Sequence, residues 1–294
     1  MWVLFGISAG AILGLYDFWT KKAMTGNAVL PVVFWSSLFG ALAWIPAFFP
    51  VSARLGVFVD ISRTSLAEQA LILVKSLAMT LSWLFAYYSV RDLPMSFSGA
   101  VRASGPIWTF VGGALLFGEM LTPVQILAVL VSVVAYYVLS VVGRKEGIDA
   151  LRSGPMLMML IATILSAMTT VYDKFIVQKL NTPIYAVQAY SALDRCALAF
   201  VVLAVASYRS NLPRLRWSSA VPLVGLAWVA AELIYFFAIA DPDANVTYLS
   251  IFRRTSLVVG FMLSVTLIGE HSVRAKSIVI TLIVLSTAVL ILDR

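Results

Sequence analysis

Apolar runs of about 20 residues recur along the whole chain, and this feature constrains its fold more than any other. A run of this length spans the hydrocarbon core of a bilayer as an α-helix. Of the 294 residues, 61% are hydrophobic and only 12% are charged, whereas a soluble domain carries about 25% charged residues. Barrel strands show short alternating patterns rather than continuous apolar runs. The sequence therefore predicts an all-α membrane protein that crosses the bilayer several times.

Ten such runs are predicted to form transmembrane helices, separated by short gaps that hold turn residues and charges. Two runs begin at Pro94 and Pro183, and the first turn of a helix tolerates proline. The first run has no basic segment before it and continues to Trp19, so it is expected to be a retained helix rather than a cleaved signal. The predicted helices cover residues 2–20, 29–49, 66–89, 94–117, 122–142, 154–178, 183–208, 218–240, 246–268 and 273–292.

An internal repeat divides the chain. The stretch Arg102–Glu119 recurs as Arg253–Glu270 at an offset of 151 residues, and Arg, Phe, Leu, Gly and Glu fall at matching places without a gap. Two further motif pairs match at offsets of 156 and 155 residues, namely Tyr16-Asp17 with Tyr172-Asp173 and Trp35-Ser36 with Tyr190-Ser191. The sequence therefore predicts two related halves, residues 1–145 and 150–294.

Each predicted half contains five helices, and this odd number determines how the halves relate to each other. After five crossings the chain emerges on the opposite side of the membrane, so the second half is expected to run inverted relative to the first. Inverted repeats occur in secondary transporters, where the substrate site lies near the midplane between the repeats. The predicted fold is an all-α membrane protein whose ten transmembrane helices form two inverted five-helix repeats around a central cavity.

Ten helices, two five-helix repeats and a Gly-Glu pair at the end of the fourth helix of each repeat resemble the drug/metabolite transporter superfamily, in its EamA-like branch. The two pairs are Gly118-Glu119 and Gly269-Glu270, and the resemblance covers essentially the whole chain. It implies a transporter rather than an enzyme, located in the bacterial inner (plasma) membrane, with the fifth and tenth helices at the periphery. It does not specify the substrate, because members carry amino acids, cofactors, nucleotide sugars, quaternary amines and drugs.

Ten ionisable residues lie inside the predicted helices or near their ends, six basic and four acidic, which is more than we expect for a generic drug exporter. Ionisable side chains are costly in a bilayer and usually face the bundle interior or a wet cavity. Aromatic residues share helix faces with several of them, and a ring beside a charge can form a binding wall. The candidate substrate-binding residues are Arg102, Arg253, Lys75, Trp83, Tyr87, Glu232, Tyr235, Asp194 and Arg195.

The excess of basic groups predicts a substrate with an anionic group, because arginine binds a carboxylate or phosphate through paired hydrogen bonds. The acidic residues leave room for an amine, so a zwitterionic metabolite fits as well. Glu232 and Asp194 are carboxylates in low-dielectric surroundings, which makes them candidate proton-coupling groups. The predicted function is secondary active transport of a small anionic or zwitterionic metabolite, with protons as a candidate second partner.

Structural explanations compete with these functional ones. Stripes of small residues more often serve helix packing than ligand binding, and buried charges can pair with each other, as Asp194 would with an arginine of the ninth helix. Asp17 and Asp173 are interpreted either as matching parts of two gates, one on each membrane side, or as helix-end residues beside interfacial tyrosines. Lys174 is expected to extend to the membrane interface. Glu119 and Glu270 are interpreted either as a gate or link to the following helix, or as favourable charges near the start of that helix.

Several other functions are not expected. The net charge of +7 lies mostly in short loops, where it sets topology, so nucleic-acid binding is not predicted. The single His271 and the single Cys196 provide no histidine cluster, no HExxH motif and no internal disulfide, and the chain has no Walker loop, so we predict no cofactor and no metal. The open alternatives are a multidrug or quaternary-amine exporter of the same fold, and a membrane enzyme or lipid-handling scaffold.

Charge distribution and resemblance disagree about orientation. Lys and Arg are more frequent in the loops on the side opposite the termini, which by the positive-inside rule places both ends outside. Members of the superfamily usually have both ends in the cytoplasm. The only further partner predicted is the lipid bilayer, and the sequence carries no signal for the oligomeric state.

Overall fold

The structure is a computed structural model in which every regular element of the described residues is a helix. This confirms the predicted all-α class. The described residues are 1–49, 61, 64–93, 98, 101–102, 104–120, 122–124, 126–128, 130–131, 134, 153–209, 215–267, 277, 281–282 and 285. The predicted fifth and tenth helices lie largely outside these residues, as does Glu270.

Six of the described helices are long and apolar enough to cross a membrane, as an integral membrane protein requires. They correspond to six of the predicted spans: α1 (Trp2–Met24), α2 (Val29–Trp44) with the 3-10 turn η1 (Ile45–Phe48), α4 (Leu66–Asp92), α8 (Gly154–Lys174) with the π-helical turn η2 (Phe175–Lys179), α9 (Ile184–Arg209) and α10 (Ala220–Ile239). Three shorter helices are also described: α6 (Gly105–Phe117), α11 (Val246–Phe252) and α12 (Thr255–Leu267).

The ninth predicted helix, residues 246–268, is not continuous, and in this respect the prediction is wrong. A turn at Arg253 and Arg254 separates α11 from α12. The turn is tightened by a hydrogen bond from the Arg254 N–H to the Ile251 carbonyl, at 2.8 Å. Neither proline nor glycine marks this position in the sequence. Breaks in membrane helices are tolerated where the backbone lines a cavity or is buried in protein.

The matching place in the first half is irregular as well. Residues 101 and 102 are helical, Ser104 lies in a turn, and α6 begins at Gly105. Pro106 has no N–H to donate to the Arg102 carbonyl, so the regular hydrogen-bond pattern is interrupted here. Both arginines of the repeat, Arg102 and Arg253, therefore lie just before the start of a short helix.

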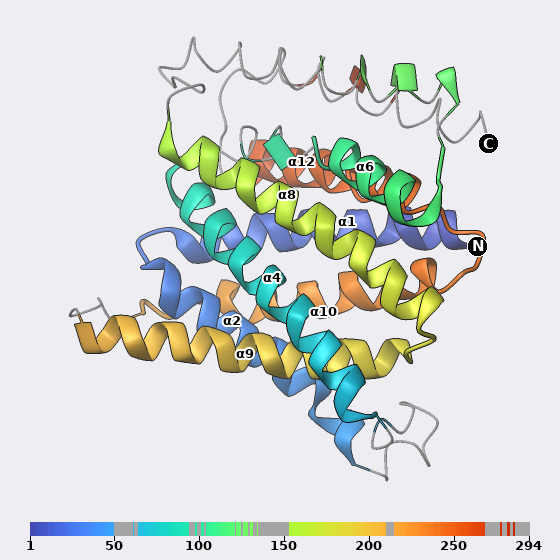
Figure 1. Ribbon diagram of the computed structural model, residues 1–294. Helices are drawn as coiled ribbons and strands as arrows, with labels where there is room; N and C mark the ends of the chain where they lie inside the picture. The colour runs from blue at the N-terminus through green and yellow to red at the C-terminus, as the bar shows by residue number, and fades with distance from the viewer. Residues whose placement is uncertain are drawn as a thin grey trace.

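The helices of the two predicted halves interdigitate (Figure 1). α1 packs against α10 and α12, α4 against α8 and α9, and α2 against α9 and α10. The most extensive helix contacts all join a helix of residues 1–145 to one of residues 150–294. The buried core is therefore the interface between the halves, and this interface brings the charged residues of both halves together.

Two helix backbones of opposite halves approach closely at Gly225, where α10 crosses α2. A Cβ added at Gly225 would lie 2.2 Å from the Ser36 carbonyl oxygen and 2.9 Å from the Gly40 backbone nitrogen. Small residues permit such approaches between membrane helices. The absence of a side chain at Gly225 is thus a requirement of this crossing.

Candidate functional site

A cavity lies between the two halves, bounded by α1, α4, α8, α10 and the break between α11 and α12. Its volume of ≈ 70 Å³ is enough for several waters, but ligand pockets typically have ~300–1,000 Å³. A ligand of metabolite size therefore requires the surrounding helices to move apart. The charged residues that line the cavity are Asp17, Arg102, Arg253 and Arg254, so three positive charges accompany one negative charge.

Asp17 and Arg102 form an ion pair at the cavity wall. Asp17 lies in the second half of α1 and Arg102 lies shortly before α6, so both belong to the first half of the chain. Their side chains keep 15% and 22% of their surface exposed. Beside them the Tyr16 hydroxyl donates a hydrogen bond to the hydroxyl of the fully buried Tyr87, at 3.3 Å. The structure thus brings Asp17, Arg102 and Tyr87 into one neighbourhood.

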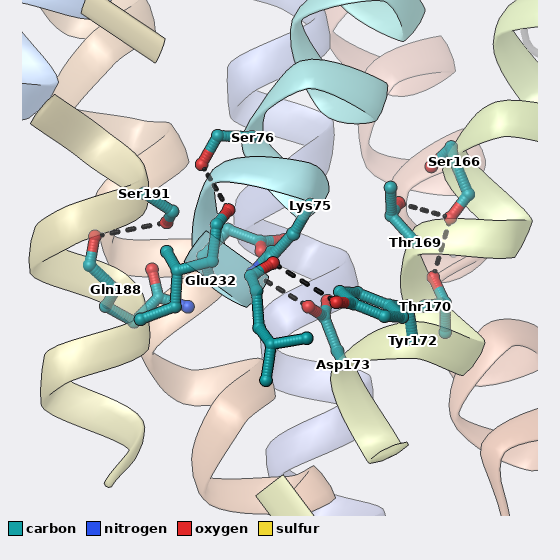
Figure 2. A network of polar contacts seen from close by, with 12 residues as sticks. Lys75, Ser76, Ser166, Thr169, Thr170, Tyr172, Asp173, Gln188, Ser191 and Glu232 are labelled. Atoms are coloured by element: carbon teal, nitrogen blue, oxygen red, sulfur yellow. Dashed lines mark hydrogen bonds and ion pairs between the residues drawn. The ribbon is translucent and has the colours of Figure 1, made fainter. Parts of the chain in front are cut away.

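Lys75 and Asp173 form a second ion pair, which is buried and joins the two halves. The distance from Lys75 Nζ to Asp173 Oδ1 is 2.8 Å, and the side chains are 0% and 2% exposed. Figure 2 shows these side chains of α4 and α8 pointing toward each other. The cavity-lining residues of α4 begin after Lys75, and those of α8 end before Asp173. The pair therefore lies beyond one end of the cavity.

Glu232 and Arg253 form a third ion pair next to the second. Arg253 Nη2 donates a hydrogen bond to Glu232 Oε1 at 2.7 Å, and the guanidinium carbon lies 4.3 Å from the ring centre of Tyr235. Asp173 interacts electrostatically with both partners of this pair. We call Lys75, Asp173, Glu232 and Arg253 the ion-pair cluster. Its two cations and two carboxylates come from α4, α8, α10 and the α11–α12 break.

Asp194 lies away from the arginines of the ninth predicted helix. Its carboxylate is half-buried and accepts a hydrogen bond from the Ser76 hydroxyl at 3.1 Å. The alternative in which Asp194 pairs with an arginine of that helix is wrong, because Asp194 belongs to none of the ion pairs among the described residues and Glu232 pairs with Arg253. Asp194 and Arg195 also point in different directions, since successive residues of a helix lie about 100° apart.

Arg195 is buried against the aromatic residues of the cavity wall. Its guanidinium carbon lies 5.3 Å from the ring centre of Trp83 and 5.8 Å from that of Trp228. Arg195 Nη1 donates to the Ser191 hydroxyl at 3.4 Å. Within the described part of the chain, no carboxylate lies within ion-pair distance of Arg195. The positive charge of Arg195 is stabilised by these cation–π contacts and by longer-range attraction to the carboxylates of Glu232, Asp173 and Asp194.

Trp228 and Arg254 also line the cavity, although neither is among the candidate residues predicted from the sequence. Trp228 lies one turn before Glu232 on the same face of α10, so helical spacing from Glu232 identifies it. A continuous helix would point Arg253 and Arg254 in different directions. Only the break between α11 and α12 brings both arginines to the cavity.

Lys174 and Glu119 connect the two halves beside the ion-pair cluster. Lys174 Nζ lies 2.6 Å from Glu119 Oε1 and donates to the Ala244 carbonyl at 2.7 Å. The Glu119 carboxylate also accepts from the N–H of Val246, the first residue of α11, at 3.2 Å. The prediction that Lys174 extends to the membrane interface is wrong, because these two acceptors hold its ammonium in a buried position. Glu119 stabilises the start of α11, which is a different helix from the following one named in the prediction.

Glu119→Gln is expected to lower the free energy of unfolding by about 1–2 kcal/mol, because the buried Lys174 ammonium loses its carboxylate. Thermal unfolding of the purified protein in detergent measures the change. Asp92→Asn is the matched control, because the Arg91–Asp92 pair is 43% exposed on both side chains. Loss of such an exposed pair costs at most about 1 kcal/mol. Equal shifts for the two variants would contradict a buried link at Glu119.

Comparisons with known proteins agree with this architecture. The EamA-like transporter family matches residues 1–141, which confirms the family predicted from the sequence. A solved structure described only as "Crystal structure of protein" is similar, with a TM-score of 0.70 and 18% sequence identity over 99% of this chain and 95% of that chain. At this identity the likeness shows the fold alone. No curated protein matches the sequence.

Proposed function

Because residues 1–141 belong to the EamA-like transporter family, we propose that this chain is a secondary active transporter that moves a small anionic or zwitterionic metabolite by alternating access. The observation that carries the proposal is the charged cavity between the halves, with the buried ion-pair cluster beyond one end. Alternating access requires a central site that both halves enclose and that opens to one side at a time. We place the protein in the bacterial inner (plasma) membrane.

Two features support a division into two inverted repeats of five helices, residues 1–145 and 150–294. The first is the helix irregularity at the two matching arginines described above. The second is a pair of equivalent contacts between the first and third helices of each half. Lys21 Nζ donates to the Val90 carbonyl at 2.6 Å, and Gln178 Nε2 donates to the Ile239 carbonyl at 2.9 Å. Lys21 and Gln178 each follow their Tyr-Asp motif by about one helical turn.

Asp17 and Asp173 are proposed parts of gates at opposite ends of the cavity. The Asp17–Arg102 pair keeps part of its surface exposed, whereas the Lys75–Asp173 pair is buried. This difference corresponds to a state that is closed at the Asp173 end. Opening that end separates Lys75 from Asp173, and entering water then compensates both charges.

The charge of the cavity supports an anionic or zwitterionic substrate. Arginines bind carboxylates and phosphates through paired hydrogen bonds, and Arg102, Arg253 and Arg254 all line the cavity. A quaternary-amine exporter of the same fold fits less well, because the cavity lining has one carboxylate, that of Asp17, against three arginines. Glu232 and Asp194 are retained as proposed proton-coupling groups; flux that ignores an imposed pH gradient would remove that role.

Flux measurements in proteoliposomes test the proposal. Ser166 lines the cavity, and Ser166→Leu is expected to fill space that the substrate needs and to slow flux about tenfold or more. The matched control is Ser207→Leu, because Ser207 lies exposed on α9 outside the cavity. Mass spectrometry of vesicles loaded with pooled anionic and zwitterionic metabolites reports the flux. Folded wild-type protein that moves none of them would overturn the proposal.

A further inference from the structure

The cavity has two chemically different kinds of lining. Tyr16 of α1, Trp83 of α4 and Trp228 of α10 form an aromatic wall. The ring centres of Tyr16 and Trp228 lie 5.1 Å apart, and those of Trp83 and Trp228 lie 4.8 Å apart at 88°. The polar part of the lining comes mainly from hydroxyl-bearing residues of α8 and from the arginines before α6 and α12. A ligand that satisfies both linings needs an apolar part and a charged part.

Arg195 supports the aromatic wall, and two indole N–H donors of the wall have no acceptor among the described residues. The guanidinium of the buried Arg195 contacts both indole rings, and a cation and the face of an aromatic ring attract each other. In the described structure neither Trp83 Nε1 nor Trp228 Nε1 has a hydrogen-bond acceptor, although both atoms are buried. Leaving a buried N–H donor without an acceptor is unfavourable. An oxygen substituent on the ring of a bound ligand would relieve this cost.

The polar lining has a concentration of positive charge at Arg254. This residue directly precedes α12, and a Cβ added at Gly105, the first residue of α6, would lie 2.5 Å from Arg254 Nη2. The guanidinium therefore lies against the start of α6, and its Nε donates a hydrogen bond to the Ser250 carbonyl at 3.2 Å. The helix α6 has 13 residues, and a helix N-terminus carries partial positive charge that favours an anion. A carboxylate at this place would be attracted by the guanidinium and by the start of α6.

We propose that the cavity is selective for an amphipathic organic anion, a carboxylate attached to a flat apolar ring. The carboxylate binds at Arg254 and the start of α6, and the ring packs on Trp83 and Trp228. This inference adds the chemical class of the substrate to the proposed transport function. It rests on that function, which identifies the cavity as the substrate site. The selectivity distinguishes such a substrate from compact anions, which leave the aromatic wall unused, and from flat cations, which Arg254 repels.

Equilibrium binding to the purified full chain in lipid nanodiscs tests the inference. The probes are 2-naphthoate, benzoate, acetate, inorganic phosphate and benzylamine, followed by tryptophan fluorescence and by calorimetry. We expect 2-naphthoate and benzoate to bind at least about tenfold more tightly than acetate, phosphate or benzylamine. Acetate or phosphate that binds as tightly as benzoate would overturn the inference, and so would a preference for benzylamine.

Two substitutions separate the two parts of the site. Trp228→Leu is expected to weaken binding of the aromatic carboxylates about tenfold and to leave acetate unchanged. Arg254→Gln is expected to weaken the binding of every carboxylate probe by about tenfold or more. The matched controls are Trp217→Leu and Arg209→Gln, because both residues are exposed and neither lines the cavity. An unchanged ratio of benzoate to acetate affinity in Trp228→Leu would contradict the role of the aromatic wall.

The outcomes for this inference and for the proposed transport function can be told apart. Selective binding of aromatic carboxylates without protein-dependent flux in proteoliposomes would overturn transport and leave the binding site in place. Flux of compact anions without preference for a ring would overturn the inference alone. Flux that favours ring-bearing carboxylates, and that Arg254→Gln slows more than Arg209→Gln does, would support both.

Discussion

Lys75→Met is expected to lower the free energy of unfolding by about 3–5 kcal/mol, because it leaves the buried Asp173 carboxylate without the cation at 2.8 Å. Methionine keeps an unbranched chain in the same space, so little of the loss would come from packing. Thermal and denaturant-induced unfolding in one detergent measure the change. The matched control is Arg91→Met, because the Arg91–Asp92 pair is exposed and contributes at most about 1 kcal/mol.

A double variant separates stability from gating. Lys75→Met combined with Asp173→Leu removes both charges, and stability is expected to return to within about 1–2 kcal/mol of the wild type, since apolar pairs often replace buried ion pairs at little cost. If this pair is part of a gate, the folded double variant should transport more slowly than the wild type, because the apolar pair resists hydration when the end opens. Wild-type flux in the double variant would leave the pair with a structural role only.

Gly225→Ala is expected to destabilise the protein by about 3 kcal/mol, which is the upper end of the usual cost of overpacking. The yield of folded protein should fall accordingly. The new Cβ would lie 2.2 Å from the Ser36 carbonyl oxygen and 2.9 Å from the Gly40 nitrogen. Both are backbone atoms, so no side-chain rotation can make room, and α2 and α10 must separate. The yield of monodisperse protein after detergent extraction and its thermal stability measure the effect.

Gly40→Ala is the matched control, because it adds the same methyl group to the other helix of this crossing. A Cβ at Gly40 would have its nearest neighbours at 3.6 Å, the Gly225 carbonyl oxygen and a methyl group of Val229, which is ordinary van der Waals contact. We expect a change of less than about 1 kcal/mol. Equal destabilisation by both substitutions would show that the crossing tolerates no methyl group on either helix and would refute the specific clash at Gly225.

Local features of the sequence predict most of the helices, because length and apolar composition are enough to identify a membrane span. The six long described helices follow the predicted boundaries to within a few residues. The break in the ninth span is different, because neither proline nor glycine marks it. A break of this kind depends on whether the freed backbone groups find partners in the surrounding protein, and periodicity carries no information about those partners.

The candidate site was predictable as a set of residues but not as a set of pairs. The cost of a charge in a bilayer was enough to select Lys75, Asp173, Glu232 and Arg253 as residues of the interior. Which cation meets which carboxylate depends on how helices distant in sequence are rotated and how closely they approach. For that reason the sequence assigned Asp194 the wrong partner and directed Lys174 to the interface.

By itself the sequence determined that this chain is helical, apolar and membrane-embedded, with a repeated arginine stretch and costly charges inside its helices. These properties follow from composition and spacing, which are local and additive. The tertiary structure decided which charges neutralise each other, that the Lys75–Asp173 pair is buried whereas the Asp17–Arg102 pair is partly exposed, and that Trp228 and Arg254 belong to the cavity. Those results depend on contacts between helices that are distant in the sequence, as between Lys75 and Asp173, or on a helix break that those contacts permit.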